Sequence, residues 1–525
     1  MTSVYLIGIC GAAMATLAAM LKQSGIEVQG SDVDAFPPMD EFLEGQGITP
    51  LRGYDAAHIT EDIELVVIGN AVSRGNPEVE AVLDRHIRYV SLPDMLRDRF
   101  LWTRRPVVVS GTHGKTTTTA MVAWVLAEAG VDPSFFVGGI PTNFDASFRI
   151  GQGDVFVIEG DEYDSAFFDK TAKFLKYLPN VAVVGNIEFD HADIYADLEA
   201  LRIAFRRFIS GVPRNGHVLL GADDDEAQRL ADVAHCPVET FGLTAYSDWR
   251  AVDVRYDRDC TRFNVVHAGA TVAYVQLPLL GVFNVKNALA AMAAANAVGT
   301  PPEIAAAALG RFQGVRRRLE LRGVARGVAV YDDFAHHPTA VRETLLALRT
   351  TVLEGRLRAV FEPRSASACR RVFQGDFVEA LAVADDVVVA PVHRSTLPAE
   401  ERLSEATLVA DLVAAGTPAR HAESLDSISD MIVDTAVAGD VVVLMSNGDF
   451  GQLHDVILNR LAGFMEKGQR LKKKIQGRTE QARDNKGRHP GEQRKGFASE
   501  ASAHAQQSRN CDDDQNDGVC QIHVK

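Results

Sequence analysis

The stretch PVVVSGTHGKTTTTAMVAWVLAEAG, residues 106–130, decides the fold of this chain. It begins with three valines, 107–109, and a β-branched apolar run of this length predicts a short buried strand. From 116 to 129 the apolar residues recur at helical spacing, and Gly130 follows as a residue that can end a helix. A glycine-containing loop therefore connects a strand to the start of a helix. Such a loop points backbone N–H groups and the positive end of the helix dipole at one spot.

This loop predicts a site for a nucleoside triphosphate. Lys115 supplies a positive charge for the β- and γ-phosphates, and Thr116 offers a hydroxyl to Mg²⁺. The general phosphate-loop pattern has a glycine five residues before Gly114, where this chain has Val109, so the loop is a shortened variant. The alternative is a turn that only caps an ordinary helix. The residues expected to contact ATP here are Gly111, Thr112, His113, Gly114, Lys115, Thr116 and Thr117.

Composition narrows the class of protein. A length of 525 residues is enough for about three domains of ~150 residues. No apolar run approaches the ~20 residues that span a bilayer, and no basic segment precedes the first strand as in a signal peptide. The six scattered cysteines show no zinc spacing, and the net charge of −16 gives no general attraction to nucleic acid. We expect a multidomain cytoplasmic enzyme that binds neither membranes nor nucleic acid.

The first segment predicts a Rossmann-like βαβ unit. A strand at 4–7, a helix at 15–24 and a strand at 27–30 are followed by an acidic residue, as in dinucleotide-binding folds. Its loop departs from GxGxxG, so it can hold the diphosphate of another nucleotide, or be only a tight turn. An NAD-dependent dehydrogenase is the alternative that this unit alone would suggest. The substrate-binding candidates from this segment and from the loop after a strand at 65–68 are Gly8, Gly11, Asp32, Asn70, Ser73 and Arg74.

Two further strand ends carry acidic residues. The strand at 155–158 is followed by four carboxylates in six residues, which is typical of a hard-cation site, and Glu159 lies nearest the strand end. His191 follows another strand, at 181–184, beside acidic residues; it is either a core histidine or, as we favour, a ligand to a second metal. The expected metal ligands are Thr116, Glu159 and His191, and the expected catalytic residues are Lys115, Glu159 and His191. Strands that alternate with helices and end in such sites predict a doubly wound sheet.

The rest of the sequence predicts an antiparallel edge of the sheet, followed by a third α/β unit. Short segments with turns at 216–280 indicate antiparallel strands. Asn284 and Asn287 begin an alanine-rich helix, where they can read a base edge or simply cap the helix. Four later strands end in polar residues, where open sheets bind ligands. The peptide-side candidates there are His336, Arg364 and Asn447. Residues 466–525 are polar and are expected to be disordered.

Over residues 1–465 the chain resembles the Mur ligases of peptidoglycan synthesis. The shared motifs, in order, are GTHGKTTT (111–118), E-x-D-E-x-D (159–164), NIEFDH (186–191), N-x-x-N (284–287), RRLE (317–320) and DDFAHHPT (332–339). The resemblance implies an α/β fold of three domains: a UDP-sugar-binding Rossmann-like domain (1–104), a central P-loop ATPase-like doubly wound sheet (105–320) and a C-terminal Rossmann-like, peptide-binding domain (321–465). It also implies that Arg318 and Asp333 engage the nucleotide.

Within the family the chain resembles the branch that acts in peptidoglycan recycling. The segments that carry this resemblance are GICGAAM (8–14), GSDVDAFPPM (30–39), EGDEYDSAFFDK (159–170) and NIEFDHADIY (186–195). The implied reaction joins L-alanyl-γ-D-glutamyl-meso-diaminopimelate to UDP-N-acetylmuramate through an acyl-phosphate, with ATP and Mg²⁺. The alternative acceptor is L-alanine. Two positions depart from the family pattern: Phe283 replaces a usual histidine, and residues 192–215 contain no lysine to be carbamylated as a metal ligand.

Overall fold

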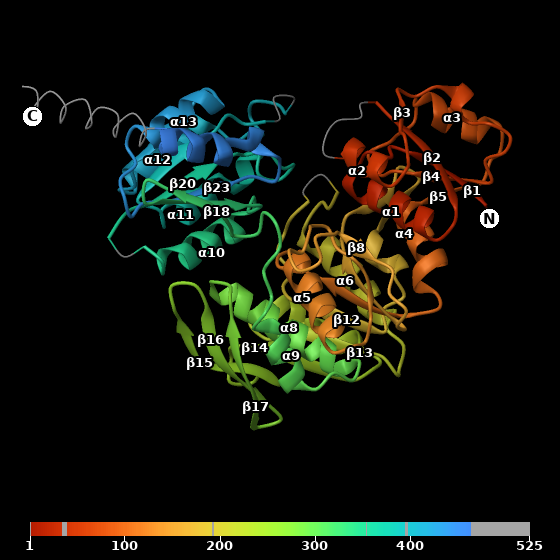
Figure 1. Ribbon diagram of the computed structural model, residues 1–525, viewed down its shortest axis with the longest axis horizontal. Coiled ribbons are helices and arrows are strands. Elements are labelled where there is room, and N and C mark those ends of the chain that lie inside the picture. The colour runs from red at the N-terminus through yellow and green to blue at the C-terminus, as the bar shows by residue number, and fades with distance from the viewer. Residues whose placement is uncertain (1, 34–38, 192–193, 353, 394–396, 464–525) are drawn as a thin grey trace, which may run out of the picture. The chain divides into compact units, whose positions relative to one another are not determined.

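The computed structural model describes residues 2–33, 39–191, 194–352, 354–393 and 397–463 (Figure 1). The tail 466–525 that we expected to be disordered, and parts of the segments 30–39 and 186–195, lie outside the described residues. Three α/β sheets of five, ten and six strands account for most of the strands, and a short hairpin supplies the rest. The predicted α/β class is therefore confirmed. Within the described ranges, no helix has the length and apolarity needed to cross a membrane.

The first sheet is entirely parallel, in the order β3-β2-β1-β4-β5. The strand order reverses at β1, so the loop after β1 lies at the switch point where such sheets bind ligands. The first helix begins at Ala12, three residues earlier than predicted, because the extended Gly11 precedes it as the N-cap. The elements are β1 (Ser3–Ile7), α1 (Ala12–Gln23), β2 (Glu27–Asp32), α2 (Met39–Gly45), β3 (Leu51–Arg52), β4 (Leu65–Ile68), α3 (Pro77–Asp84), β5 (Tyr89–Ser91) and α4 (Leu92–Leu96).

The ten-stranded sheet has the order β17-β16-β15-β14-β13-β12-β6-β9-β7-β8. β6 lies between β9 and β12 and pairs with both in parallel, so the carboxyl ends of these three strands share one edge. The elements up to the hairpin β10–β11 are β6 (Arg105–Ser110), α5 (Lys115–Glu128), β7 (Ser134–Phe136), β8 (Phe148–Arg149), β9 (Val155–Gly160), β10 (Asp164–Ala166) and β11 (Asp169–Ala172). Those that follow are β12 (Val181–Val184), α6 (Leu198–Ser210), β13 (His217–Gly221), α7 (Asp225–Gln228), β14 (Val238–Gly242), β15 (Trp249–Tyr256), β16 (Thr261–His267), β17 (Ala270–Leu277), α8 (Val282–Ala297) and α9 (Pro302–Leu309).

The prediction of antiparallel strands over 216–280 is wrong for the first part of that segment. β13 and β14 continue the parallel sheet, and only β15, β16 and β17 form an antiparallel meander. The difference arises because α7 and the short helix after it form a crossover between β13 and β14, which parallel pairing requires. α5, α8 and α9 pack in one apolar cluster with this sheet. That packing holds the loop before α5 on a rigid support.

The six-stranded sheet has the order β18-β19-β23-β20-β21-β22 and is parallel except for the edge pair β18–β19. Alternate residues of its central strands enter two apolar clusters, as expected for a sheet with helices on both faces: Val443 lies in one and Val442 in the other. The elements are β18 (Glu320–Ala325), β19 (Val328–Asp333), α10 (Pro338–Arg349), β20 (Leu357–Phe361), α11 (Gln374–Leu381), β21 (Asp386–Val389), α12 (Glu405–Ala414), β22 (Ala419–His421), α13 (Leu425–Val433) and β23 (Val441–Met445).

Candidate active site at the phosphate loop

A cavity of about 740 Å³ opens beside the loop between β6 and α5. This volume suits a nucleotide-sized ligand. Its lining comes from the carboxyl ends of the ten-stranded sheet, from the start of α8 and from the loops after β19 and β23. The sequence-predicted residues that line it are Asn70, Thr112, His113, Gly114, Lys115, Thr116, Thr117, Glu159, His191, Asn284, Asn287, Arg318, Asp333, His336 and Asn447.

Two glycines of the loop have backbones that other residues rarely adopt. Gly111 has φ +125°, and a Cβ there would lie 3.0 Å from the Asn186 carbonyl oxygen. Gly114 has φ +82°, and a Cβ there would lie 2.5 Å from Asn287 Oδ1. α5 begins directly after Gly114, so its first N–H groups face the cavity side of the loop. This is the arrangement that the strand–glycine–helix pattern predicted.

Lys115 is held in place by the acidic segment after β9. Its Nζ donates to the Gly111 carbonyl at 2.8 Å and to Glu162 Oε2 at 2.9 Å. Burial alone would lower the pKa of Lys115, but the charges of Glu162 and Asp161 raise it, so the amine stays protonated. A buried, charged amine beside a glycine loop is equipped to neutralise phosphate oxygens.

Thr116, Glu159 and Arg318 form a second cluster at the loop. The Thr116 hydroxyl donates to Glu159 Oε1 at 2.9 Å, and Arg318 Nη2 lies 3.0 Å from the same hydroxyl. Burial and the Asp161 charge raise the pKa of Glu159. A hydroxyl and a carboxylate side by side next to a phosphate loop are the oxygen donors with which proteins hold Mg²⁺. The residues present therefore fit a magnesium ion.

His191 contacts the carboxylate that also pairs with Lys115. Its Nε2 lies 3.2 Å from Glu162 Oε1, so Glu162 stands between His191 and Lys115. Burial opposes protonation of His191, but Glu162 and Asp190 raise its pKa. Sequence reasoning had marked Glu162 only as one of four clustered carboxylates. Its central position was not predicted, because four carboxylates within six residues do not show which one faces the lysine.

The two asparagines at the start of α8 are partly structural. Asn284 is buried and its amide donates to the Leu280 carbonyl at 2.8 Å, while Asn287 Nδ2 donates to Asn284 Oδ1 at 3.2 Å. Both still line the cavity, together with Phe283. The helix-capping alternative is not met, because the N-cap of α8 is Gly281 and no side chain of the described chain caps this helix, while Asn287 lies beside the phosphate loop.

The polar residues after β19 and β23 differ in how many hydrogen bonds they make within the protein. Asp333 accepts hydrogen bonds from the backbone N–H of Leu319 at 2.6 Å and of Ala335 at 2.8 Å, and burial raises its pKa. Burial lowers the pKa of His336 to about 4, so this imidazole is neutral at pH 7. Asn447 Oδ1 is buried and has no hydrogen-bond partner within the described chain.

The remaining candidates do not belong to the lining of this cavity. Asp32 accepts from the Cys10 N–H at 2.9 Å, at the switch point of the first sheet with Gly8 and Gly11. Arg74, expected to meet a phosphate with its neighbour Ser73, is paired with the Glu80 carboxylate at 2.9 Å on the surface. Arg364 lies 3.6 Å from Glu362 and against Gly448. Gly111 shapes the loop from outside the lining.

Comparison with known proteins finds three family models that match consecutive parts of the chain. Family models match residues 3–100 ("Mur ligase family, catalytic domain"), 109–295 ("Mur ligase middle domain") and 317–448 ("Mur ligase, glutamate ligase domain"). The chain is 43% identical over 468 residues to the UDP-N-acetylmuramate–L-alanyl-γ-D-glutamyl-meso-2,6-diaminoheptanedioate ligase of Escherichia coli, covering 89% of this chain and 100% of that one.

Two further matches extend this likeness. The UDP-N-acetylmuramate–L-alanine ligase of Paenarthrobacter aurescens is 37% identical over 468 residues, with 88% of this chain and 97% of the relative covered. The crystal structure of a murein peptide ligase from Psychrobacter arcticus superposes with a TM-score of 0.67 at 34% identity, covering 88% of this chain and 99% of that one. The family suggested by the six motifs is confirmed over nearly the whole described chain, and the protein is a member of the Mur ligase family.

Proposed function

We propose that the protein joins the carboxyl group of UDP-N-acetylmuramate to the amino group of L-alanyl-γ-D-glutamyl-meso-diaminopimelate, with conversion of ATP to ADP and phosphate. The observation that carries this is the 43% identity to a ligase named for that reaction, against 37% to the L-alanine ligase quoted above. The phosphate loop, with its buried lysine and paired hydroxyl and carboxylate, supports ATP as the co-substrate. We expect the reaction to take place in the cytoplasm, as a step of peptidoglycan recycling.

The chemistry needs two transfers. A carboxylate does not react with an amine at neutral pH, because oxide would have to leave. In the first transfer a muramate carboxylate oxygen attacks the γ-phosphorus and ADP leaves, which gives an acyl-phosphate. In the second, the tripeptide amine attacks the acyl carbon, phosphate leaves, and the amine gives up a proton. Both transfers require neutralisation of phosphate charge more than covalent help from the protein.

The residues of the cavity supply that neutralisation. Lys115 and the loop N–H groups face the phosphates, and Arg318 adds a second cation from the neighbouring segment. Bound Mg²⁺ would neutralise charge between phosphate oxygens, and Thr116 and Glu159 would hold it. We assign His191, which contacts Glu162 in the acidic segment after β9, as a ligand to a second metal ion. His336, Arg364 and Asn447 are our candidates for the peptide, and Asn287 for the nucleotide base.

We assign one ligand to the part of the chain around each of the three sheets. We assign residues 1–104 to the UDP-sugar, with Gly8, Gly11, Asp32 and Asn70 at the switch-point side of the first sheet. Residues 105–320 bind ATP, and residues 321–465 bind the peptide. Arg74 forms an ion pair with Glu80 at the surface. We therefore expect Arg74 to contact a phosphate only if this ion pair breaks.

The test is phosphate release from ATP and UDP-N-acetylmuramate, with the tripeptide or L-alanine as acceptor. Release with the tripeptide alone is the expected result. Release with L-alanine alone would replace the proposed acceptor and keep the ATP and Mg²⁺ assignment. Release with neither would contradict the ligase proposal. Absorbance at 340 nm with NAD(H) should not change, in contrast to a dehydrogenase.

A further inference from the structure

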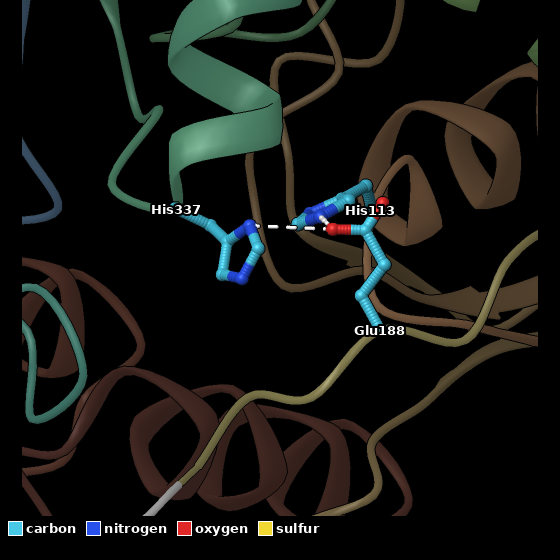
Figure 2. Close-up of side chains that lie close together, drawn as sticks. All are labelled: His113, Glu188 and His337. Atoms are coloured by element: carbon cyan, nitrogen blue, oxygen red, sulfur yellow. Dashed lines mark hydrogen bonds and ion pairs between the residues drawn. The ribbon is translucent and has the colours of Figure 1, made fainter. Parts of the chain in front are cut away.

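Two histidines from distant segments converge on one carboxylate beside the phosphate loop (Figure 2). His113 Nε2 lies 3.4 Å and His337 Nδ1 lies 3.5 Å from Glu188 Oε2. His113 belongs to the phosphate loop, Glu188 to the loop after β12, and His337 directly precedes α10. One ligand atom from each residue lies within 4.8 Å of the others. His113 is among the residues expected to contact ATP, but none of the roles proposed above uses Glu188 or His337.

The hydrogen bonds around His337 fix which ring nitrogen carries a proton. Nε2 lies 3.4 Å from the Phe189 carbonyl oxygen, which can only accept, so Nε2 is the donor. Nδ1 accepts from the Thr339 N–H at 3.4 Å, so it carries a lone pair. The lone-pair side of the ring therefore faces a carboxylate.

Glu188 places a carboxylate oxygen 3.5 Å from this lone pair. The Thr339 hydroxyl donates to Glu188 Oε2 at 2.6 Å and orients the carboxylate. His337 Nδ1 and Glu188 Oε2, 3.5 Å apart, are two electron-pair donors that one cation can bind together.

The donor set selects the kind of cation. Two imidazole nitrogens and one carboxylate oxygen suit Zn²⁺ and similar ions, whereas Mg²⁺ prefers oxygen donors alone. For bonds of about 2.0–2.1 Å, neighbouring ligand atoms of a tetrahedral zinc lie about 3.3–3.4 Å apart. Both imidazole–carboxylate distances, 3.4 and 3.5 Å, are close to that value. The two rings need a shift of roughly an ångström toward each other to share an ion.

The outer contacts also resemble those of built metal sites. Metal-binding histidines usually donate their second N–H to a carbonyl or carboxylate, as His337 does to Phe189. We propose that His113, Glu188 and His337 bind one divalent transition-metal ion of the Zn²⁺ class, separate from the oxygen site at Thr116 and Glu159. The ion ties the phosphate loop to the first turn of α10. Three protein ligands leave a fourth position open to water or another ligand.

Zinc binding to the full untagged chain, without nucleotide and in excess Mg²⁺, tests this proposal. Isothermal titration of Zn²⁺ should reveal a site whose affinity falls at least 10- to 100-fold in Glu188→Gln and in His337→Asn. Asparagine is chosen because it can still cap α10, and glutamine because it keeps the shape of Glu188. The matched control is His421→Ala, at an exposed histidine at the end of β22, which should bind as the wild type does.

A second probe reports on the ligands directly. Co²⁺ bound by two imidazoles and a carboxylate should give visible absorption that Glu188→Gln and His337→Asn lose and that His421→Ala keeps. Circular dichroism melting establishes that the variants are folded. Equal Zn²⁺ affinity in wild type and both ligand variants, or no Zn²⁺ binding to wild type, would overturn the proposal. Neither result bears on the ligase assay, which uses different substrates and a different readout.

Discussion

Lys115 and Glu162, 47 positions apart, form a largely buried ion pair in which Nζ lies 2.9 Å from Oε2. Glu162 also contacts His191 at 3.2 Å, so one carboxylate lies between the lysine and the histidine. An ATP phosphate that engages Lys115 has to compete with this carboxylate. The pair therefore keeps the lysine charged and extended toward the loop before the nucleotide arrives.

Replacing Lys115 by alanine should abolish ATP-dependent ligation. The variant loses the cation that neutralises the transferred phosphate, and loss of one such group lowers kcat by roughly 10²–10³-fold. Steady-state phosphate release with all three substrates measures this, and circular dichroism checks the fold. Lys22→Ala, at an exposed lysine of α1, is the control. Near-normal turnover in Lys115→Ala would refute the assignment of the phosphate site.

Replacing Glu159 by alanine should raise the Mg²⁺ concentration needed for half-maximal activity. The carboxylate is one of two oxygen ligands offered by the protein, because Thr116 supplies the other at 2.9 Å from it. The measurement is phosphate release titrated with Mg²⁺ at fixed ATP. Glu44→Ala, at an exposed position of α2, should leave the titration unchanged. An unchanged titration in Glu159→Ala as well would mean that Glu159 does not hold the metal.

Replacing Arg318 by lysine should impair the use of ATP more than the same change at Arg316. Arg318 is partly buried, donates to the Thr116 hydroxyl at 3.0 Å and lies 4.4 Å from the centre of the Phe334 ring. A lysine cannot keep both contacts. Loss of a charged hydrogen bond, ~1.5–3 kcal/mol, corresponds to about 10- to 100-fold in kcat/KM for ATP. Arg316, half exposed and paired with Asp145, should tolerate lysine; equal losses at both positions would contradict a specific role for Arg318.

The parts of the fold that the sequence predicts well are local. The valine run, the glycines and the helix that follows appear as β6, the loop and α5, because strand, turn and helix propensities act over a few residues. The start of α1 and the pairing of β13 and β14 were missed. Gly11 resembles a loop residue when read alone, and β13–β14 pairing depends on a crossover whose helix has only four residues.

In the site too, the sequence predicts local features better than contacts between distant side chains. The motifs identified the residues that gather at the cavity, but not their partners. Arg74 pairs with Glu80 instead of remaining available for a ligand, and His191 faces Glu162. Such pairs depend on the directions of side chains that lie far apart in sequence. Glu188 and His337 lay within recognised motifs and still were not singled out, because their contact exists only in three dimensions.

The last prediction concerns stability, at a buried ion pair in the six-stranded sheet. Arg358 is 0% exposed and its Nη2 lies 2.7 Å from Asp386 Oδ2, whereas Arg420, 40% exposed, lies 2.9 Å from the same oxygen. Arg358→Ala leaves Asp386 buried with one solvent-screened partner and should cost about 3–5 kcal/mol of local stability. Arg420→Ala should cost about 0.2–1 kcal/mol. Hydrogen exchange of the β20 and β21 amides measures both losses. Equal protection in the two variants would mean that burial does not set the strength of this pair.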